Sequence, residues 1–395
     1  MRAFAVWLSL ALLGLLPGMA AETTAPVATP PAATTPATAV KKPFTGTTRA
    51  EAELGKHTSE EIEKEVKLVK DEKAIAHLND IAATIAPFTQ RPDVVYSCKI
   101  LDTGELNAES IPGGTIYVTK GLLDAVESDH ELAGVLAHEI AHNSLHHAQK
   151  LMEHERNASM VQVASMLAMI YMNRDENVPA ADLLTMSELV KEALVNGYTI
   201  ELEAQADANG VDYLAQTKKY DPVGLYSVIL GFEQIELHHP EMQMGYLKTH
   251  PYSDERRKAL EKKLADMHIP INLWNVVNFR ASVILPKKND TGYVLRLGDV
   301  NCFTFEAGND GQDAATRAAA AAASINHRLQ AAYIQQYDVG ADQHDDLLNI
   351  TFRGVPVLTL TKADATAANL KLDTLGAYVV ANIKTALWHE HVKRA

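Results

Sequence analysis

His138 and His142 flank an acidic residue, Glu139, in the segment HEIAH. Histidines four residues apart lie one turn apart on the same face of a helix, where both imidazoles could hold one metal ion. Glu139 would stand beside that ion and could accept a proton from metal-bound water. On a helix, this H-E-x-x-H pattern is typical of zinc-dependent hydrolysis. It can also occur by chance on a solvated face, so the surrounding sequence must decide.

The stretch 128–147 has the features of a capped helix that could carry this pair. Ser128 followed three residues later by Glu131 is a capping-box start. Apolar residues then recur at helical spacing, at Leu132, Val135, Leu136 and Ile140. We therefore predict a helix with one stripe facing a core and the histidine pair on one face. Other histidines are expected at the surface of this helix, namely His130, His146, His147 and His154. His147 could sit near the metal, but it lies five residues after His142 and so off the ligand face.

A catalytic zinc ion takes three protein ligands and leaves one position open. The segment 201–210, ELEAQADANG, predicts a second helix with acidic residues. Glu203 and Asp207 lie four residues apart and share a face. Glu203 could therefore complete the ligand set, and Asp207 could accept the free ring N–H of a ligand histidine. Glu201 is the competing ligand, but it lies on a different side of the helix. The predicted ligands of one Zn2+ per chain are His138, His142 and Glu203.

His250 is a further candidate, and two roles are open to it. It precedes Pro251, which favours an extended turn before the helix predicted at 252–264. In a functional role, His250 would reach the site and either steady the oxyanion or occupy the open metal position in a latent state. In a structural role, it would only cap or pack. We favour the functional role, and Arg256 in the following helix has the same two interpretations.

The N-terminal sequence predicts export. Segment 1–20 has Arg2, an apolar run and a Pro-Gly break before small residues, which is typical of a signal peptide. Segment 21–44 is rich in Ala, Thr and Pro and predicts a disordered linker. The net charge of −14 argues against nucleic acid as a partner. No transmembrane span is predicted, while peripheral membrane contact stays open. We expect a protein of the periplasm of a Gram-negative bacterium.

Cys98 and Cys302 are the only cysteines of the chain. In an exported protein they could form a disulfide bond that ties the two halves of the chain together. Two cysteines are no disulfide framework, however, and the sequence leaves their pairing open.

Other elements must position the site. Segment 51–86 predicts one or two amphipathic helices that pack on the catalytic unit. Segments 93–101 and 111–118 predict strands. The glycines of IPGGTIYV would let another backbone come close, and a peptide substrate pairing with an exposed strand edge is one candidate. An ordinary turn into a short strand is the alternative. The residues of this candidate edge are Gly113, Gly114, Ile116 and Tyr117.

The pattern changes near residue 273. Strands are predicted at 278–286, 293–305, 347–353 and 355–361, and helices at 314–334 and 372–388. This order predicts a small α+β domain at 273–395, after a domain at 45–272. The C-terminal sequence has no metal-ligand cluster, nucleophile elbow or phosphate loop. We therefore expect an accessory binding or regulatory domain with an unknown ligand, and a structural cap is the alternative.

An ordered set of motifs between about residues 50 and 270 resembles the M48 metallopeptidases. The set comprises Asn107-Ala108, Pro112-Gly113-Gly114, Ile116-Tyr117-Val118, Gly121-Leu122-Leu123, HEIAH at 138–142, Gly197-Tyr198-Thr199, Glu203 with Ala206-Asp207, Tyr220-Asp221-Pro222, Thr249-His250-Pro251 and Arg256. The resemblance, which is to the soluble periplasmic branch, implies a mainly α zincin-like catalytic domain with a small β-sheet. It also implies one zinc ion and endopeptidase activity on proteins.

The resemblance assigns roles by position. His138, His142 and Glu203 match the zinc ligands, Glu139 matches the general base, and Asp207 matches the acidic residue behind the site. The family often has Arg where Ile200 stands, a second Glu at Gln205, and Arg before the last histidine at His146. These departures remove neither a ligand nor the base. They concern the charge network behind the metal and therefore the level of activity.

The expected function is that of an exported zinc metalloendopeptidase that hydrolyses peptide bonds of misfolded or envelope proteins. One alternative is a weakly active or latent M48-like protein that serves as a chaperone or binding factor in the cell envelope. A metal-free structural protein is the other alternative. Zinc content and chelator-sensitive degradation of casein separate the three.

Overall fold

The computed structural model covers the whole chain and describes residues 46–154, 158–172, 178–238, 248–251, 254–285, 292–306, 308 and 311–392. The predicted signal peptide at 1–20 and the linker at 21–44 lie outside the described residues. In the described parts, no helix combines the length and the apolar character needed to cross a membrane.

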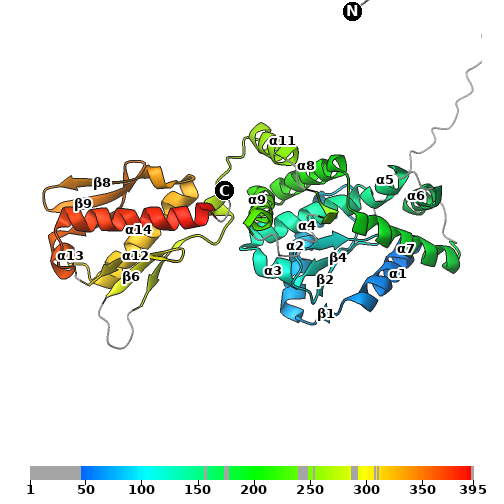
Figure 1. Cartoon of the computed structure of the whole chain (residues 1–395), viewed down its shortest axis with the longest axis horizontal. Coiled ribbons are helices and arrows are strands. Elements are labelled where there is room, and N and C mark those ends of the chain that lie inside the picture. The colour runs from blue at the N-terminus through cyan, green and yellow to red at the C-terminus, as the bar shows by residue number, and fades with distance from the viewer. Residues whose placement is uncertain are drawn as a thin grey trace, which may run out of the picture. The chain divides into compact units, whose positions relative to one another are not determined.

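The first part of the chain is mainly helical, with a small sheet (blue to green in Figure 1). Its helices are α1 (Arg49–Glu65), α2 (Glu72–Ile85), α3 (Lys120–Ala125), α4 (Asp129–Ser144), α5 (His147–His154), α6 (Ala158–Tyr171), α7 (Ala180–Asn196), α8 (Ile200–Thr217), α9 (Val223–His238) and α11 (Asp254–Asp266). Its strands are β1 (Leu68–Val69), β2 (Ser97–Leu101), β3 (Ala108–Ser110) and β4 (Thr115–Thr119). Asp71, Ser128 and Thr199 accept N–H groups of the first turns of α2, α4 and α8 and so fix where these helices begin. The predicted fold class is confirmed.

The four strands form one sheet in the order β1-β2-β4-β3. β4 runs parallel to β2 and antiparallel to β3, so both of its edges are paired. The prediction that Ile116 and Tyr117 offer a free edge to a substrate is therefore wrong, and β3 is the edge strand on that side. Gly113 and Gly114 have φ angles of 88° and 92° and form the turn between β3 and β4, where Gly113 packs on α1. The glycine pair thus makes a tight turn against a helix.

Helix α4 lies at the centre of this part, and nearly all its side chains are buried. It contacts α2, β3, α8 and α9. Two glycines make the contact with α9 unusually close, because a Cβ atom on Gly134 would lie 2.6 Å from the backbone nitrogen of Leu225. A Cβ atom on Gly224 would overlap the carbonyl oxygen of His130. The backbones of the two helices are therefore in direct contact, which fixes the position of α4 relative to α9.

The last part of the chain is α+β, as predicted (yellow to red in Figure 1). Its elements are β5 (Ala281–Ile284), β6 (Tyr293–Leu297), β7 (Val300–Phe305), α12 (Ala314–Ala331), β8 (Val339–His344), β9 (Leu347–Phe352), β10 (Val355–Thr361), α13 (Lys362–Ala367) and α14 (Leu372–Val392). β5-β6-β7 and β8-β9-β10 are two antiparallel meanders, each followed by a long helix. α12 packs on β5, β6 and β10, whereas α14 packs on β8, β9 and β7. Each helix thus contacts its own meander and the third strand of the other. The sequence patterns missed β8 and α13, and the single strand predicted at 293–305 is two strands, β6 and β7, that pair antiparallel.

Cys98 in β2 and Cys302 in β7 are both buried, and both are free thiols. Burial raises the pKa of each thiol to about 12, so both stay protonated near neutral pH. The structure therefore answers the question that the sequence left open, and no disulfide bond joins the two cysteines.

Candidate metal centre

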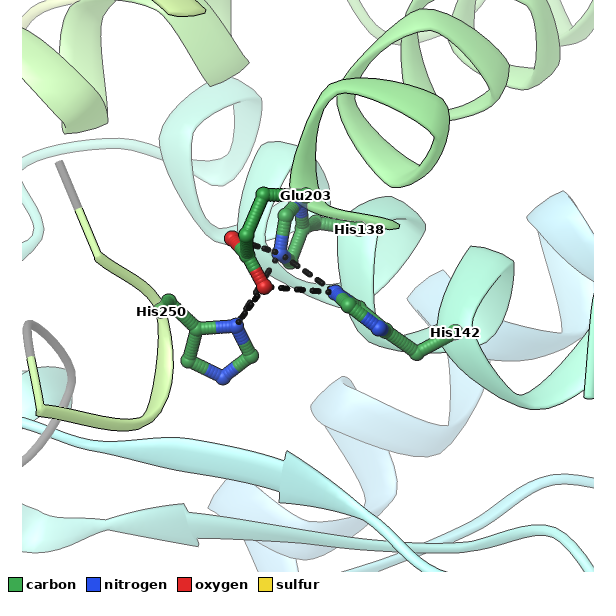
Figure 2. Close-up of side chains that lie close together, drawn as sticks. All are labelled: His138, His142, Glu203 and His250. Carbon is green, nitrogen blue, oxygen red and sulfur yellow. Dashed lines mark hydrogen bonds and ion pairs between the residues drawn. The ribbon is translucent and has the colours of Figure 1, made fainter. Parts of the chain in front are cut away.

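Four predicted residues converge on one point in the first part of the chain, as Figure 2 shows. His138 and His142 come from α4, Glu203 comes from the first turn of α8, and His250 comes from the segment 248–251. All four side chains are buried, and one ligand atom from each lies within 4.8 Å of the other three. Two helices and the segment 248–251 thus bring three nitrogens and one carboxylate together.

The distances between these ligand atoms test whether a zinc ion fits. Nε2 of His138 lies 2.9 Å from Nε2 of His142 and 3.4 Å from Oε2 of Glu203, whose Oε1 lies 3.2 Å from Nε2 of His142. Nδ1 of His250 lies 3.3 Å from Nε2 of His138 and 3.0 Å from Oε1 of Glu203. Tetrahedral zinc with bonds of about 2.0–2.1 Å separates its ligand atoms by about 3.3 Å. The constellation therefore fits a tetrahedral zinc ion.

The two acidic candidates on α8 are clearly distinguished. Glu203 is fully buried and faces the two histidines, whereas Glu201 is exposed on another side of the helix. Thr199 caps α8 through the N–H of Leu202 and so sets the turn from which Glu203 projects. The side of the helix that Glu203 shares with Asp207 is the side that faces α4.

Asp207 lies behind His138, where its Oδ1 is 2.9 Å from Nδ1 of the imidazole. This contact holds the proton on Nδ1 and leaves Nε2 free to bind a metal. Arg256 in α11 donates to both oxygens of Asp207, at 2.8 and 2.9 Å, and pairs with Glu203 at 2.8 Å. Its guanidinium is buried and thus balances two buried carboxylates. Arg256 is therefore part of the site.

His147 has the corresponding position behind His142, with the two Nδ1 atoms 3.0 Å apart. The prediction that His147 is a surface residue off the ligand face is wrong, since its side chain is fully buried. The reason is that α4 ends at Ser144 and the chain turns before α5 begins. His146 lies in this turn with a φ angle of 57° and is largely buried, stacked on Tyr171. Helical spacing therefore no longer applied at these two positions.

Nearby positive charges keep Glu203 ionised, and burial keeps His142 neutral. Burial alone would raise the pKa of Glu203, but His250 and Arg256 hold it well below its usual value. Burial lowers the pKa of His142 well below its usual value. Burial also acts to lower the pKa of His138, but the carboxylates of Glu203 and Asp207 outweigh it and raise that pKa to about 10. A metal ion bound to His138 must therefore displace a proton.

Glu139 lies next to the ligands and is held by the edge strand. Its Oε2 accepts the N–H of Ser110 at 2.9 Å, and the hydroxyl of Ser110 donates to the carbonyl of Glu139 at 2.7 Å. Burial raises the pKa of Glu139, although His250 and His138 act in the opposite direction. A carboxylate with a raised pKa beside a metal site is suited to accept and return a proton.

His250 lies between the ligands and the edge strand β3. Its Nε2 is 3.4 Å from Oε1 of Glu139 and 3.4 Å from the carbonyl oxygen of Ala108. The backbone of the same segment is fixed because Tyr198 donates its N–H to the carbonyl of Thr249 at 2.8 Å. The ring of His250 therefore lies within the site, in contact with the candidate ligand Glu203, the candidate base and the strand edge.

Of the sequence departures from the family pattern, Ile200 lies outside this network, whereas the side chain of Gln205 interacts with His147 behind His142. Ile200 is 50 % exposed at the start of α8, and Gln205 is partly buried and accepts a long bond of 3.5 Å from Lys150. Arg256 supplies the positive charge that balances Glu203 and Asp207. The departures therefore leave the ligands and the groups behind them in place.

Comparisons with known proteins agree with this geometry. Residues 72–264, which include the ligands, the candidate base and His250, match the model of peptidase family M48. Among similar proteins, the mitochondrial metalloendopeptidase OMA1 of Bos taurus is 27% identical over 211 residues, which cover 51% of this chain and 38% of OMA1. The beta-barrel assembly-enhancing protease of Escherichia coli (strain K12) is 21% identical over 210 residues, 52% of this chain and 42% of that protein. Metalloprotease LoiP of the same organism is 28% identical over 170 residues, 42% of this chain and 62% of LoiP. The chain thus spans less than two thirds of the length of these relatives.

Proposed function

Because residues 72–264 belong to peptidase family M48, we propose that this protein is a zinc-dependent endopeptidase that hydrolyses peptide bonds of proteins. The observation that carries the proposal is the convergence of His138, His142 and Glu203 at tetrahedral spacing, with Glu139 beside them. One zinc ion per chain would be held by these three side chains. Relatives that are named metalloendopeptidases or metalloproteases support the same activity.

The chain's own residues divide the chemistry among them. A zinc ion at this site would supply Lewis acidity, which polarises a carbonyl group and acidifies a water molecule. Glu139 is placed to accept a proton from an attacking water and to return it to the leaving amine nitrogen. Asp207 and His147 keep the two ligand imidazoles in the tautomer that presents Nε2. Arg256 keeps the buried carboxylates ionised.

Glu139→Gln tests this mechanism. The amide keeps the size of the side chain but cannot act as a base, so the variant should bind one zinc ion per chain and lose activity by at least about a thousandfold. The measurements are zinc content by elemental analysis and digestion of casein with and without a chelator. Glu188→Gln, an exposed carboxylate on α7, is the matched control. Wild-type activity in Glu139→Gln would show that the base is assigned wrongly.

His250 supports a latent resting state. Its Nδ1 completes the four donors, and its ring lies where a substrate strand would meet β3. We propose that His250 occupies the fourth position at rest and must leave before a substrate binds. His250→Ala should then digest casein faster than the wild type at equal zinc content. If His250→Ala is slower than the wild type, His250 stabilises the oxyanion instead. If neither protein cleaves casein, the alternative function of a binding factor or chaperone is supported.

The natural substrates and the compartment are also proposals. The predicted signal peptide supports export to the periplasm, where misfolded or envelope proteins would be the substrates. A relative named beta-barrel assembly-enhancing protease supports the same setting, whereas others are named mitochondrial. Exposed Val161, Met169 and Met172 in and just after α6 support peripheral membrane contact. Mass spectrometry of the exported fraction from cells with wild type or Glu139→Gln tests both proposals, because substrates should accumulate only with the variant.

We further propose that residues 45–272 and 273–395 are separate domains and that the second binds an accessory ligand. A cavity of about 310 Å³ lies between α12 and β10 in the C-terminal part and gives such a ligand a place to bind. Limited proteolysis should cut between the two parts and release two stable fragments. A single fragment that spans residue 272 would contradict this division.

A further inference from the structure

Glu109 lies at the middle of the edge strand β3, between two residues that contact the catalytic groups. Ser110 donates its N–H to Glu139, and the carbonyl of Ala108 faces His250. The side chain of Glu109 points to the other face of the sheet, because Glu109 pairs with Tyr117 across the ladder and side chains alternate along a strand. Glu109 is therefore within one residue of the candidate active site, yet the mechanism described above does not use it.

The carboxylate of Glu109 is only partly satisfied. Its Oε1 atom is fully shielded from solvent and has no hydrogen-bond partner among the residues that the structure describes, which is costly for an ionisable group. Burial, with the nearby charge of Glu139, raises its pKa to about 7. Lys191 is a cation whose charge acts on Glu109, but its Nζ pairs with Glu65 at 2.5 Å. The described part of the chain thus places a buried acceptor at this strand and contains no donor for it.

The position of Glu109 on the edge indicates where the missing donor comes from. A peptide that pairs with the free edge of β3 places one side chain directly opposite Glu109, on the same face of the extended sheet. The backbone groups that flank Glu109 reach Glu139 and His250, so this peptide residue lies close to the bond that is cut. A lysine or arginine there would donate a charge-assisted hydrogen bond to Oε1.

We propose that Glu109 is a specificity-determining residue that selects substrates with a basic side chain opposite it, within about three residues of the cleaved bond. The inference rests on the proposed peptidase function and names the substrate class of the same site. According to this inference, the side chain of Glu109 in the edge strand determines where a substrate protein is cleaved.

Matched peptides test the proposal. Fluorogenic peptides that carry Lys or the similarly shaped but uncharged Met, at each position within three residues of the cleaved bond, are compared with wild type, Glu109→Gln and Glu109→Lys. At one position the wild type should cleave the Lys peptide with a kcat/KM about tenfold higher. Glu109→Gln should lose this ratio, and Glu109→Lys should favour a Glu peptide at the same position. Glu105→Gln removes a carboxylate just before β3 and should keep the wild-type ratio.

A binding measurement separates failure of this inference from failure of the proposed function. The same labelled peptides are titrated into zinc-loaded Glu139→Gln/His250→Ala protein, with and without Glu109→Gln, and followed by fluorescence anisotropy. Tighter binding of the Lys peptide that is lost with Glu109→Gln supports the proposal. If the protein cleaves or binds the Lys and Met peptides equally well, the proposed role of Glu109 is wrong, while the peptidase function stands. A protein that binds zinc but neither cleaves nor binds any peptide overturns the peptidase function, and the inference with it.

Discussion

A buried arginine–aspartate pair lies in each part of the chain, and the two pairs lead to different groups. In the first part, Arg256 binds Asp207 through two hydrogen bonds of 2.8 and 2.9 Å. In the C-terminal part, Arg317 binds Asp364 through two hydrogen bonds of 2.8 and 2.6 Å. The geometry of the two pairs is nearly the same, so any difference in role must come from their neighbours.

The first pair continues to the metal ligands. Asp207 contacts the ring of His138, and Arg256 also pairs with Glu203 and donates to the carbonyl of Pro251 next to His250. The second pair contacts only structural groups of the C-terminal part, as far as the described residues show. Asp364 accepts the N–H of Thr361, the residue that caps α13. Arg317 donates to the carbonyl of Thr359 and lies over the ring of Phe305. The comparison teaches that a buried ion pair indicates a functional site only when its charges reach groups that can do chemistry.

The largest effect is expected in the C-terminal pair. Asp364→Asn leaves the buried guanidinium of Arg317 without its counter-charge, which should lower the free energy of unfolding by about 3–5 kcal/mol. Zinc content of the folded variant should stay at one per chain. Asp346→Asn, which breaks the exposed pair with Lys362, is the control and should cost less than about 1 kcal/mol. Urea unfolding measures both. If folded Asp364→Asn lost its zinc, the claim that the Arg317–Asp364 pair has no part in the metal site would be wrong.

The matching change in the first part should act on the metal. Asp207→Asn removes the carboxylate that orients His138 and should weaken zinc binding about 10- to 100-fold. Competition with a chromophoric chelator measures the affinity. Asp212→Asn lies on the same helix, where Asp212 pairs with Lys263 on the surface, and it should leave the affinity unchanged. If Asp207→Asn and the wild type had equal zinc affinities, the Arg256–Asp207 pair would have only a structural role, like the Arg317–Asp364 pair.

His147 offers a smaller test of the same idea. His147→Ala removes the partner of Nδ1 in His142 and should weaken zinc binding about tenfold, because the ligand ring is no longer held in one tautomer. His77→Ala removes an exposed histidine that pairs with Asp129 and should have no effect. If the two variants bind zinc equally well, His147 only fills space behind the site.

In the absence of zinc, the stability that the Arg256–Asp207 pair contributes should decrease at acidic pH. Burial alone would raise the pKa of Asp207, but Arg256 and His138 hold it below its usual value. The unfolded chain then binds the proton more readily, so the stabilisation is complete above about pH 4 and is lost as the pH falls through the folded pKa. With chelator present, Asp207 should contribute a slope of at most about 1.4 kcal/mol per pH unit in this range. Unfolding of wild type and Asp207→Asn between pH 2 and 5 measures it. Identical slopes would contradict the contribution of Asp207.

Local sequence patterns predicted most of the site because its residues obey helical spacing. His138, Glu139 and His142 follow from one turn of α4, and the choice of Glu203 over Glu201 follows from the face it shares with Asp207. The capping residues Ser128 and Thr199 also mark where the helices begin. The same rules gave the strands and helices of the C-terminal part except β8 and α13, whose segments carry little apolar periodicity. They also missed the turn that divides the strand predicted at 293–305 into β6 and β7.

Contacts between distant segments could not be read from the sequence. Spacing along α4 placed His147 on the wrong face because the helix ends at Ser144. The pattern at 111–118 indicated a strand but not its neighbours, so the edge was assigned to β4 although β3 covers it. Whether Arg256 reaches the acidic residues depends on how α11 packs on α8, which no local pattern encodes. Partner choice in space, rather than element type, was the missing information.

The direct backbone contact of α4 with α9 at Gly134 and Gly224 makes the metal centre sensitive to positions far from any ligand. A single methyl group at Gly134 would act as a wedge that tilts the helix bearing both imidazoles, while every ligand stayed chemically intact. Such a chain could fold and yet hold its ion poorly, so that inactivating changes in this protein need not touch a residue that binds, donates or accepts anything.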